Sequence, residues 1–176
     1  MTQRSHAQLL VGMSEEEEGG HVSDNYVGEK NEQGLQHGEG IETMPWGTVY
    51  DGQWVDGKKH GQGKMTWNDG NMYDGLWKDT IFHGHGTMTY ANCDVYRGGW
   101  QGHMKHGDGL YKHASGNVYE GQWVHDKKQG KGKMAYSNGN VYTGQWEGGK
   151  PVGLHIGVKK DGSVESVLIE TLKKMC

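Results

Sequence analysis

The sequence contains little cysteine, proline, phenylalanine or arginine. In 176 residues there are two cysteines, two prolines, one phenylalanine and two arginines. Cys93 and Cys176 lie far apart and form no CxxC pattern, so we expect free thiols in a reducing compartment rather than a disulfide scaffold. The arginines, Arg4 and Arg97, provide no basic surface for phosphates or bases, and nucleic acid is not expected as a partner.

The sequence also lacks a long apolar run. None approaches the roughly 18 to 20 residues of a membrane-spanning helix, and the first fourteen residues hold only the short apolar stretch 9–11. Neither a membrane span nor a signal peptide is therefore expected, and we predict a cytoplasmic protein. Residues 1–24 carry one basic and five acidic side chains, which account for the net charge of −4. We expect this acidic segment to be flexible.

Glycine and the large aromatic residues are abundant. The chain has 32 glycines, and much of its apolar bulk comes from seven tryptophans, nine tyrosines and nine methionines. Collagen would require abundant proline and glycine at every third residue, and a disordered linker would not contain so many aromatic residues. A compact α/β domain would fill its core with Leu, Ile, Val and Phe. The composition therefore predicts a thin structure, one sheet deep.

A repeat of 23 residues organises most of the chain. Each unit has a tyrosine, a glycine two positions later and a tryptophan four positions later, and a Gly-x-Gly pair follows. Tyr26 begins one further unit of 24 residues, and after Tyr142 the pattern decays, with His155 in place of a glycine. We predict five full units and one degenerate unit within residues 25–162. The aromatic columns are Tyr50, Tyr73, Tyr96, Tyr119 and Tyr142, and Trp54, Trp77, Trp100, Trp123 and Trp146.

Both halves of a unit alternate with period two, which is typical of strands. The Asn-Asp-Gly-Asn at 68–71 and its counterparts supply left-handed residues for tight hairpin turns. The fold class predicted is therefore all-β: an elongated, single-layer antiparallel sheet of stacked β-hairpins. Because equivalent strands lie about 9.6 Å apart, residues of the intervening strand must fill the space between aromatic residues of one column.

The pattern Tyr-x-Gly-x-Trp-x-x-Gly-x-x-His-Gly-x-Gly, complete from Tyr50 to Gly63, resembles the MORN repeat family. The resemblance covers residues 26–162. It implies an elongated, twisted antiparallel sheet with an aromatic-lined groove that binds proteins or, in some members, membranes.

Shorter motifs resemble the radial spoke head proteins of ciliary axonemes. These motifs are the opening unit from Tyr26 to Gly40, the segments Gly57–Gly63 and Pro151–Gly153, and the acidic run before the first repeat. This resemblance implies a non-enzymatic structural or assembly component of the cilium or flagellum axoneme, with other axonemal proteins as partners. The alternative is a membrane-tethering module that binds acidic phospholipids through its lysines.

The candidate binding residues are the aromatic columns themselves. Large rings flanked by glycine offer flat apolar contact area at a low cost in side-chain entropy. We predict that all ten residues of the two columns line a partner-binding groove; the alternative, that these rows simply form the core, is compatible with it.

One turn departs from the repeat. Where other units carry lysines, such as Lys58 and Lys59, the third full turn carries Ile81 and Phe82, the only phenylalanine in the chain. This apolar tip either packs back over the sheet or contacts a partner. The rival feature is a set of lysines that either contacts acidic lipid or forms a solvated rim: Lys58, Lys59, Lys64, Lys127, Lys128, Lys131 and Lys133.

No pattern indicates catalysis, a metal or a cofactor. The Gly-x-Gly pairs do not continue as GxGxxG or as a P-loop, and neither a nucleophile motif nor a carboxylate pair stands out. Adjacent histidines of the column His37, His60, His83 and His106 recur about 9.6 Å apart, too far to share one zinc ion. We expect them to make local hydrogen bonds at the turns.

Residues 163–176 follow the last turn signal. Val164, Val167, Leu168 and Leu172 have the spacing of an amphipathic helix. We expect a short helix that caps the open end of the sheet, as solenoid ends require. A terminal strand or a partner-docking helix is the alternative.

Overall fold

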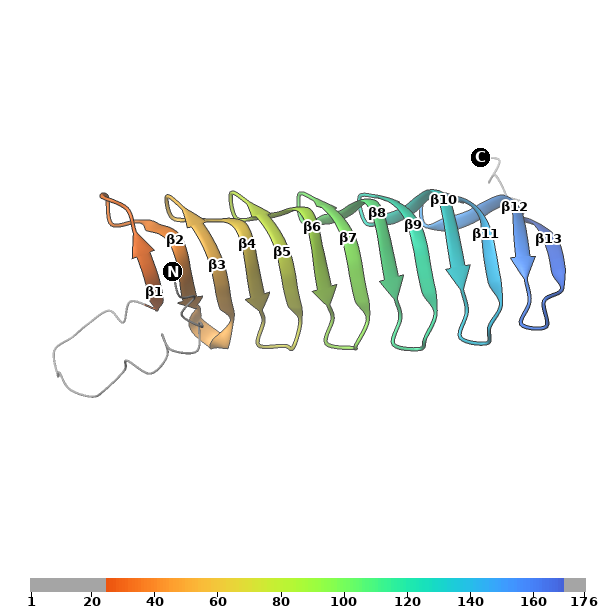
Figure 1. Cartoon of the computed structure of the whole chain (residues 1–176), viewed down its shortest axis with the longest axis horizontal. Helices are drawn as coiled ribbons and strands as arrows, with labels where there is room; N and C mark the ends of the chain where they lie inside the picture. Colours follow the sequence, from red (N-terminus) through yellow and green to blue (C-terminus); the bar gives the residue numbers. More distant parts are fainter. Residues whose placement is uncertain (1–24, 170–176) are drawn as a thin grey trace, which may run out of the picture.

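A computed structural model of the protein describes residues 25–169. This part of the chain folds into one sheet of thirteen strands and a 3-10 turn at Pro45–Gly47 (Figure 1). The strands are β1 (Tyr26–Lys30), β2 (Gln36–Thr43), β3 (Val49–Val55), β4 (Lys58–Thr66), β5 (Met72–Lys78), β6 (Ile81–Thr89), β7 (Val95–Gln101), β8 (Met104–Lys112), β9 (Val118–Val124), β10 (Lys127–Ala135), β11 (Val141–Glu147), β12 (Lys150–Val158) and β13 (Val164–Ile169).

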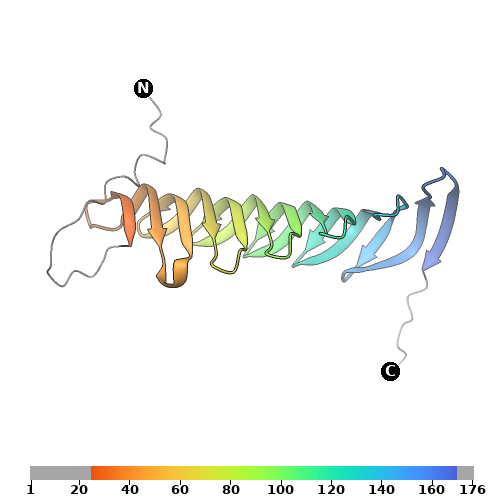
Figure 2. The same ribbon diagram turned by 90° about the horizontal axis from the view of Figure 1, so that it is seen from below.

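Every strand pairs antiparallel with the next strand along the chain, in the order β1 to β13. The hairpins follow one another along the long axis of the molecule, and the view from below shows a narrow ribbon (Figure 2). The predicted all-β, single-layer antiparallel sheet is confirmed. No helix of the described residues is long and apolar enough to cross a membrane. The predicted flexible segment 1–24 lies outside the described residues.

Two kinds of turn alternate along the ribbon. At one edge most loops close with a left-handed glycine, such as Gly70 with φ of 89°, and the loop between β6 and β7 uses Cys93 with φ of 68°. At the other edge two-residue loops have positive φ at both central positions, as at Asp56 (47°) and Gly57 (79°). Type I′ hairpins require this geometry, and Asp-Gly supplies it at little cost. The next such turn uses Asp79 and Thr80, and a β-branched residue at φ of 70° is strained.

Tyrosine and tryptophan rings form a continuous ladder on one side of the sheet, here called the aromatic face. Along β5, Tyr73, Gly75 and Trp77 are buried, whereas the residues between them face the opposite, polar face. Tyr73 contacts Trp77 of its own unit and Trp100 of the next one, both edge-on with ring centroids 5.4 Å apart. Its hydroxyl donates a hydrogen bond to the Leu76 carbonyl at 2.9 Å. The rings of neighbouring units thereby connect the strands from β1 to β11.

Glycine is required beneath each tyrosine ring. A methyl group added to Gly86 would lie 2.5 Å from the Tyr73 hydroxyl oxygen and 2.7 Å from two ring carbons. The same overlap recurs for Gly40, Gly63, Gly109 and Gly132. The carbonyls of these glycines also accept hydrogen bonds from the tryptophan indoles, as from Trp77 to Gly63 at 2.9 Å. One glycine column thus provides both the space for tyrosine and the acceptor for tryptophan.

The predicted C-terminal capping helix is wrong for the described residues. Residues 164–169 form strand β13 and not a helix, with Val158 opposite Val164 and Leu154 opposite Leu168. The outer edge of β12 offers a row of backbone groups, and a strand satisfies them where a helix would not. The spacing of Val164 and Leu168 suits one face of a strand as well as a helix, so the apolar pattern did not distinguish the two. The remaining residues of the predicted cap, 170–176, lie outside the described part.

Candidate interaction surfaces

The aromatic columns predicted to line a partner groove are mostly buried within the protein itself. Tyr50, Tyr73, Tyr96 and Tyr119 are fully buried, and the five tryptophans of the column are at most 6% exposed. Tyr142 alone is partly exposed. The structure therefore places these residues in the core, and their contact with a partner stays a prediction.

In β4, β6, β8 and β10 the second residue after the two-residue loop covers the rings from the edge of the sheet. Lys59 is 7% exposed, and its Nζ atom lies 5.1 Å from the centroid of the Tyr50 ring and 4.6 Å from that of Trp54. It also forms an ion pair with Glu42 at 2.8 Å. Cation–π contact and a carboxylate partner together make burial of this ammonium group tolerable.

The equivalent lysines of later units behave in the same way. Lys128 lies 4.7 Å from the Tyr119 ring centroid and 4.9 Å from that of Trp146, and burial lowers the pKa of its ammonium group. Lys105 lies 5.3 Å from the Tyr111 ring centroid. Lys59 and Lys128, both assigned to a lysine rim from the sequence, therefore contribute to the aromatic core.

The two residues of the apolar tip, predicted either to pack over the sheet or to contact a partner, differ from each other. Phe82 takes the place of the covering lysine and stacks on Tyr73, with ring centroids 3.9 Å apart and an interplanar angle of 11°. It is 7% exposed, whereas its neighbour Ile81 is 41% exposed. Phe82 therefore packs back over the sheet, and only Ile81 is available to a partner.

A groove of about 610 Å³ follows the middle of the polar face from β4 to β9. Cross-strand pairing places Asp74, Thr87, Arg97, Leu110 and Glu120 in one row across five consecutive strands. Asp108 adds a third carboxylate. The backbone of five glycines lines the middle of the groove between these side chains: Gly75, Gly86, Gly98, Gly109 and Gly121.

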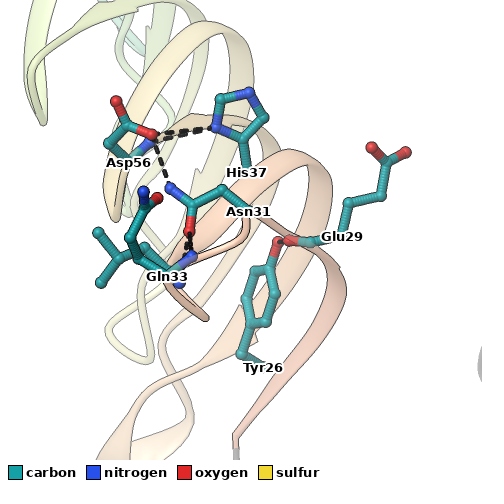
Figure 3. A network of polar contacts seen from close by, with 7 residues as sticks. Tyr26, Glu29, Asn31, Gln33, His37 and Asp56 are labelled. Atoms are coloured by element: carbon teal, nitrogen blue, oxygen red, sulfur yellow. Dashed lines mark hydrogen bonds and ion pairs between the residues drawn. The ribbon is translucent and has the colours of Figure 1, made fainter.

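The first hairpin has its own polar network, drawn in Figure 3. The Asn31 amide donates a hydrogen bond to the Asp56 carboxylate at 2.8 Å, and its oxygen accepts one from the backbone N–H of Gln33 at 3.1 Å. The Nδ1 atom of His37 lies 3.3 Å from the same Asp56 oxygen. The predicted local hydrogen bonding of the histidine column fits His37. It is wrong for the Nδ1 atoms of His60 and His106, which are buried without a hydrogen-bond partner.

A second polar cluster surrounds Asp94 at the opposite edge. Its carboxylate accepts hydrogen bonds from the Ala114 N–H and the Tyr111 hydroxyl, both at 2.8 Å. These bonds hold the pKa of Asp94 below its usual value. Among the described residues no group of three or more His, Cys, Asp or Glu side chains could hold a metal ion.

His155 occupies the place that a tyrosine ring takes in the other units. A methyl group on Gly144 would overlap the His155 ring, just as one on Gly75 would approach the Tyr73 hydroxyl. Tyr142 is consequently turned outward, and its hydroxyl donates a hydrogen bond to Glu165 of β13 at 2.7 Å rather than to its own strand. His155 is 2% exposed and neither ring nitrogen has a partner. The sequence showed the substitution, but it did not show that the ring is buried.

Sequence reasoning missed two exposed apolar features. Trp46 is 87% exposed in the 3-10 turn between β2 and β3, outside both aromatic columns. On the polar face of β12 and β13 lies an exposed apolar patch: Leu154, Ile156, Val158, Val164 and Leu168. A search for apolar residues outside the repeat columns would have found both.

The sequence matches the MORN repeat family in six segments: residues 26–49, 50–72, 73–92, 96–118, 119–141 and 142–154. These segments cover well over half of the chain, and the protein belongs to the MORN repeat family. MORN repeats are non-enzymatic binding modules, and the chain is accordingly a scaffold for protein or membrane interaction. No curated protein matches the sequence.

Solved structures give only distant similarity. The TCP10 domain of Danio rerio CPAP, in complex with a peptide of Danio rerio STIL, is 12% identical, with a TM-score of 0.37 over 80% of this chain and 68% of that one. The SAS-4 (dCPAP) TCP domain of Drosophila melanogaster, in complex with a proline-rich motif of Ana2 (dSTIL), is 12% identical, with a TM-score of 0.37 over 88% and 97%. The CPAP G-box domain is 15% identical, with a TM-score of 0.30 over 80% and 91%.

Proposed function

We propose that this protein is a non-enzymatic interaction scaffold of the cilium or flagellum axoneme, similar to the radial spoke head proteins. The axonemal assignment rests on the sequence motifs of the first unit, the segment 57–63 and the segment 151–153. The scaffold assignment rests on the MORN repeats. A long, stiff ribbon with a repeated core suits a component that holds other proteins at fixed separations.

The observation that carries the proposal is the groove on the polar face. It runs across six strands, is open to solvent, and presents Asp74, Asp108 and Glu120 beside a single Arg97. Lys64 lies opposite Asp74 and Lys133 opposite Glu120 at the two ends of this row, outside the groove lining. Within the lining, the carboxylates favour an extended partner segment that carries basic side chains. The aromatic core supports the groove from the opposite face, so its rings stabilise the surface that the partner contacts.

Reversal of the groove charges tests the proposal. Asp108→Lys with Glu120→Lys changes two exposed groove residues, whereas Glu32→Lys with Glu147→Lys makes the same charge change at exposed positions outside it. In ciliated cells, the tagged wild-type chain and the control pair should enter the axoneme and recover the same axonemal proteins. The groove pair should lose those proteins while it keeps its fold by circular dichroism. Absence of the wild type from the axoneme, or equal recovery with both pairs, would show that the proposal is wrong.

Binding to acidic membranes is a second candidate. The exposed lysines Lys131 and Lys133 lie near each other on the polar face of β10 and favour it. Against it, two lysines of the sequence-predicted set lie over aromatic rings. Co-sedimentation with phosphatidylserine vesicles at low and high salt distinguishes the two, because surface charge attraction is screened by salt. A salt-sensitive signal that Lys131→Glu with Lys133→Glu removes would support membrane binding.

A further inference from the structure

The aromatic face holds a second hollow at its C-terminal end, separate from the groove of the polar face. A cavity of about 270 Å³ lies between β10 and β13. Its walls include Met134, Tyr142, Trp146, His155 and Val167. Ligand pockets for drug-sized molecules begin at about 300 Å³, so this cavity is of a size for a single side chain.

A buried polar side chain without a hydrogen-bond partner stands within these largely apolar walls. The His155 side chain is buried, and neither Nδ1 nor Nε2 has a hydrogen-bond partner within the described part of the chain. A neutral imidazole carries one N–H donor and one nitrogen acceptor. Buried polar groups are nearly always hydrogen-bonded, and an unpaired one that borders a cavity calls for a partner within that cavity.

The end of the repeat explains why a cavity lies here. In the earlier units a tyrosine ring lies over glycine and contacts the next tryptophan, as Tyr119 contacts Trp146 at 5.0 Å. In the last unit His155 fills that ring position and Tyr142 is turned toward Glu165. No further tryptophan follows along β13 to cover the ring. The row of rings therefore ends beside the cavity, and the Tyr142 and Trp146 rings form part of its walls.

We propose that this cavity binds a tyrosine side chain from an extended segment of another protein that pairs with the outer edge of β13. The Trp146 and Tyr142 rings provide walls for edge-to-face contact, and Met134 adds a polarisable thioether. A phenol hydroxyl can accept the His155 N–H or donate to its free nitrogen, whereas a phenylalanine ring leaves both nitrogens unpaired.

The partner segment can reach the cavity along the outer edge of β13. Within the described residues β13 pairs only with β12, so its outer backbone groups are available for strand addition. Val167 lines the cavity and lies directly opposite His155 across the β12–β13 pair. A residue of the added strand opposite Val167 would project from the same face, at the open side of the cavity. The inference rests on the proposed function only in that another protein supplies the ring.

Ring binding is tested on the full chain with two small probes, N-acetyl-tyrosine amide and N-acetyl-phenylalanine amide. Titration followed by NMR should shift the imidazole nitrogens of His155 with the tyrosine probe, and that probe should bind about three- to tenfold more tightly than its phenylalanine counterpart, the factor expected for one hydrogen bond. This preference should vanish in His155→Phe, which keeps a ring and removes both nitrogens. Equal affinities in the wild type, or no shift of the His155 nitrogens, would overturn the proposal without any variant.

Strand pairing is tested with the peptide acetyl-Thr-Lys-Thr-Tyr-Thr-Lys-Thr-amide. Its binding should slow amide hydrogen exchange in β13, and a copy with alternate backbone nitrogens methylated should bind more weakly because it cannot complete the backbone pairing. If the small probes bind but the peptide does not slow amide exchange in β13, the strand-addition part of the proposal is overturned. Neither measurement involves axonemal proteins, so an incorrect axonemal assignment would leave both results unchanged.

Discussion

Replacement of Gly86 by alanine is expected to destabilise the protein far more than replacement of Gly107. The methyl group at Gly86 would overlap the buried Tyr73 ring, although the backbone φ there lies outside the left-handed region. Gly107 has φ of 72°, but a methyl group there would meet nothing within 4 Å. Conformational preference alone would give the opposite order, because only Gly107 needs a backbone that alanine disfavours.

The magnitude follows from what the Tyr73 ring would lose. Its hydrogen bond to the Leu76 carbonyl contributes about 1 kcal/mol, and each of its ring contacts with Trp77, Trp100 and Phe82 contributes about 0.5 to 1.5 kcal/mol. If the ring moved away, these losses would sum to about 3 to 5 kcal/mol, in the range of an aromatic-to-alanine change in a core. If the ring stayed, overpacking would still cost about 1 to 3 kcal/mol. We expect about 3 to 4 kcal/mol for Gly86→Ala and about 1 kcal/mol for Gly107→Ala.

Urea denaturation followed by tryptophan fluorescence and by circular dichroism measures both free energies of unfolding. Coincidence of the two transitions shows whether two-state treatment holds, which a repeat protein does not guarantee. A double-mutant cycle isolates the overlap, because Gly86→Ala should cost less than about 1 kcal/mol once Tyr73→Ala has emptied the ring position. If Gly86→Ala cost as much in that background, or less than Gly107→Ala in the wild type, the ring-over-glycine explanation would be refuted.

Four further outcomes are expected. Thr80→Gly should raise the free energy of unfolding by about 1 kcal/mol, because it relieves a left-handed threonine; an unchanged urea midpoint would argue against strain there. Tyr73→Phe should cost about 1 kcal/mol through its lost hydrogen bond, and Tyr142→Phe, whose hydroxyl bond is at a partly exposed site, should cost less; the reverse order would contradict the burial argument. Because the pKa of Asp94 is lowered, its contribution is present above the unfolded pKa near 3.8 and is lost as pH falls through the folded pKa. Stability measured from pH 6 to pH 2 should therefore fall less steeply in Asp94→Asn, and parallel curves would exclude this role. Burial raises the pKa of Tyr119 to about 12, so ionisation of this hydroxyl in the unfolded chain should lower the free energy of unfolding from about pH 10 upward. Ultraviolet absorbance of Tyr119→Phe checks the raised pKa, because the variant should lose one tyrosine that titrates late.

The repeat columns made most of the fold predictable from sequence. Tyrosine and tryptophan at fixed spacing, alternation with period two and Asp-Gly turns specify the same hairpin in every unit, so local and global preferences agree. The C-terminal strand was not predicted because the spacing of Val164 and Leu168 fits one face of a strand as well as a helix. The neighbouring strand β12 decided between them through its backbone edge, and that edge is a tertiary feature.

The candidate surfaces were less predictable, for a physical reason. Periodicity identifies the residues that share a face but not how deeply a sheet buries that face. The tyrosine and tryptophan rows were therefore correctly placed together, but their burial, and the covering of the rings by Lys59 and Phe82, came only from the structure. Trp46 was missed because it belongs to no column, although its exposure is the largest among the exposed large apolar side chains.

Glycine determines where the tyrosine rings of this protein can pack. Beneath each tyrosine of the first five units, the absence of a side chain admits the ring, and the ring then fills the aromatic face. On the other side of the same strands, the backbone of these glycines lines the polar groove. Where His155 replaces that glycine, the tyrosine turns outward and a cavity with an unpaired imidazole takes its place. Restoring the repeat with His155→Gly should therefore bring Tyr142 back over β12, shift its hydroxyl bond from Glu165 to its own strand and close the cavity. Persistence of the Tyr142–Glu165 contact in a crystal structure of this variant would show that β13, not His155, displaces the ring.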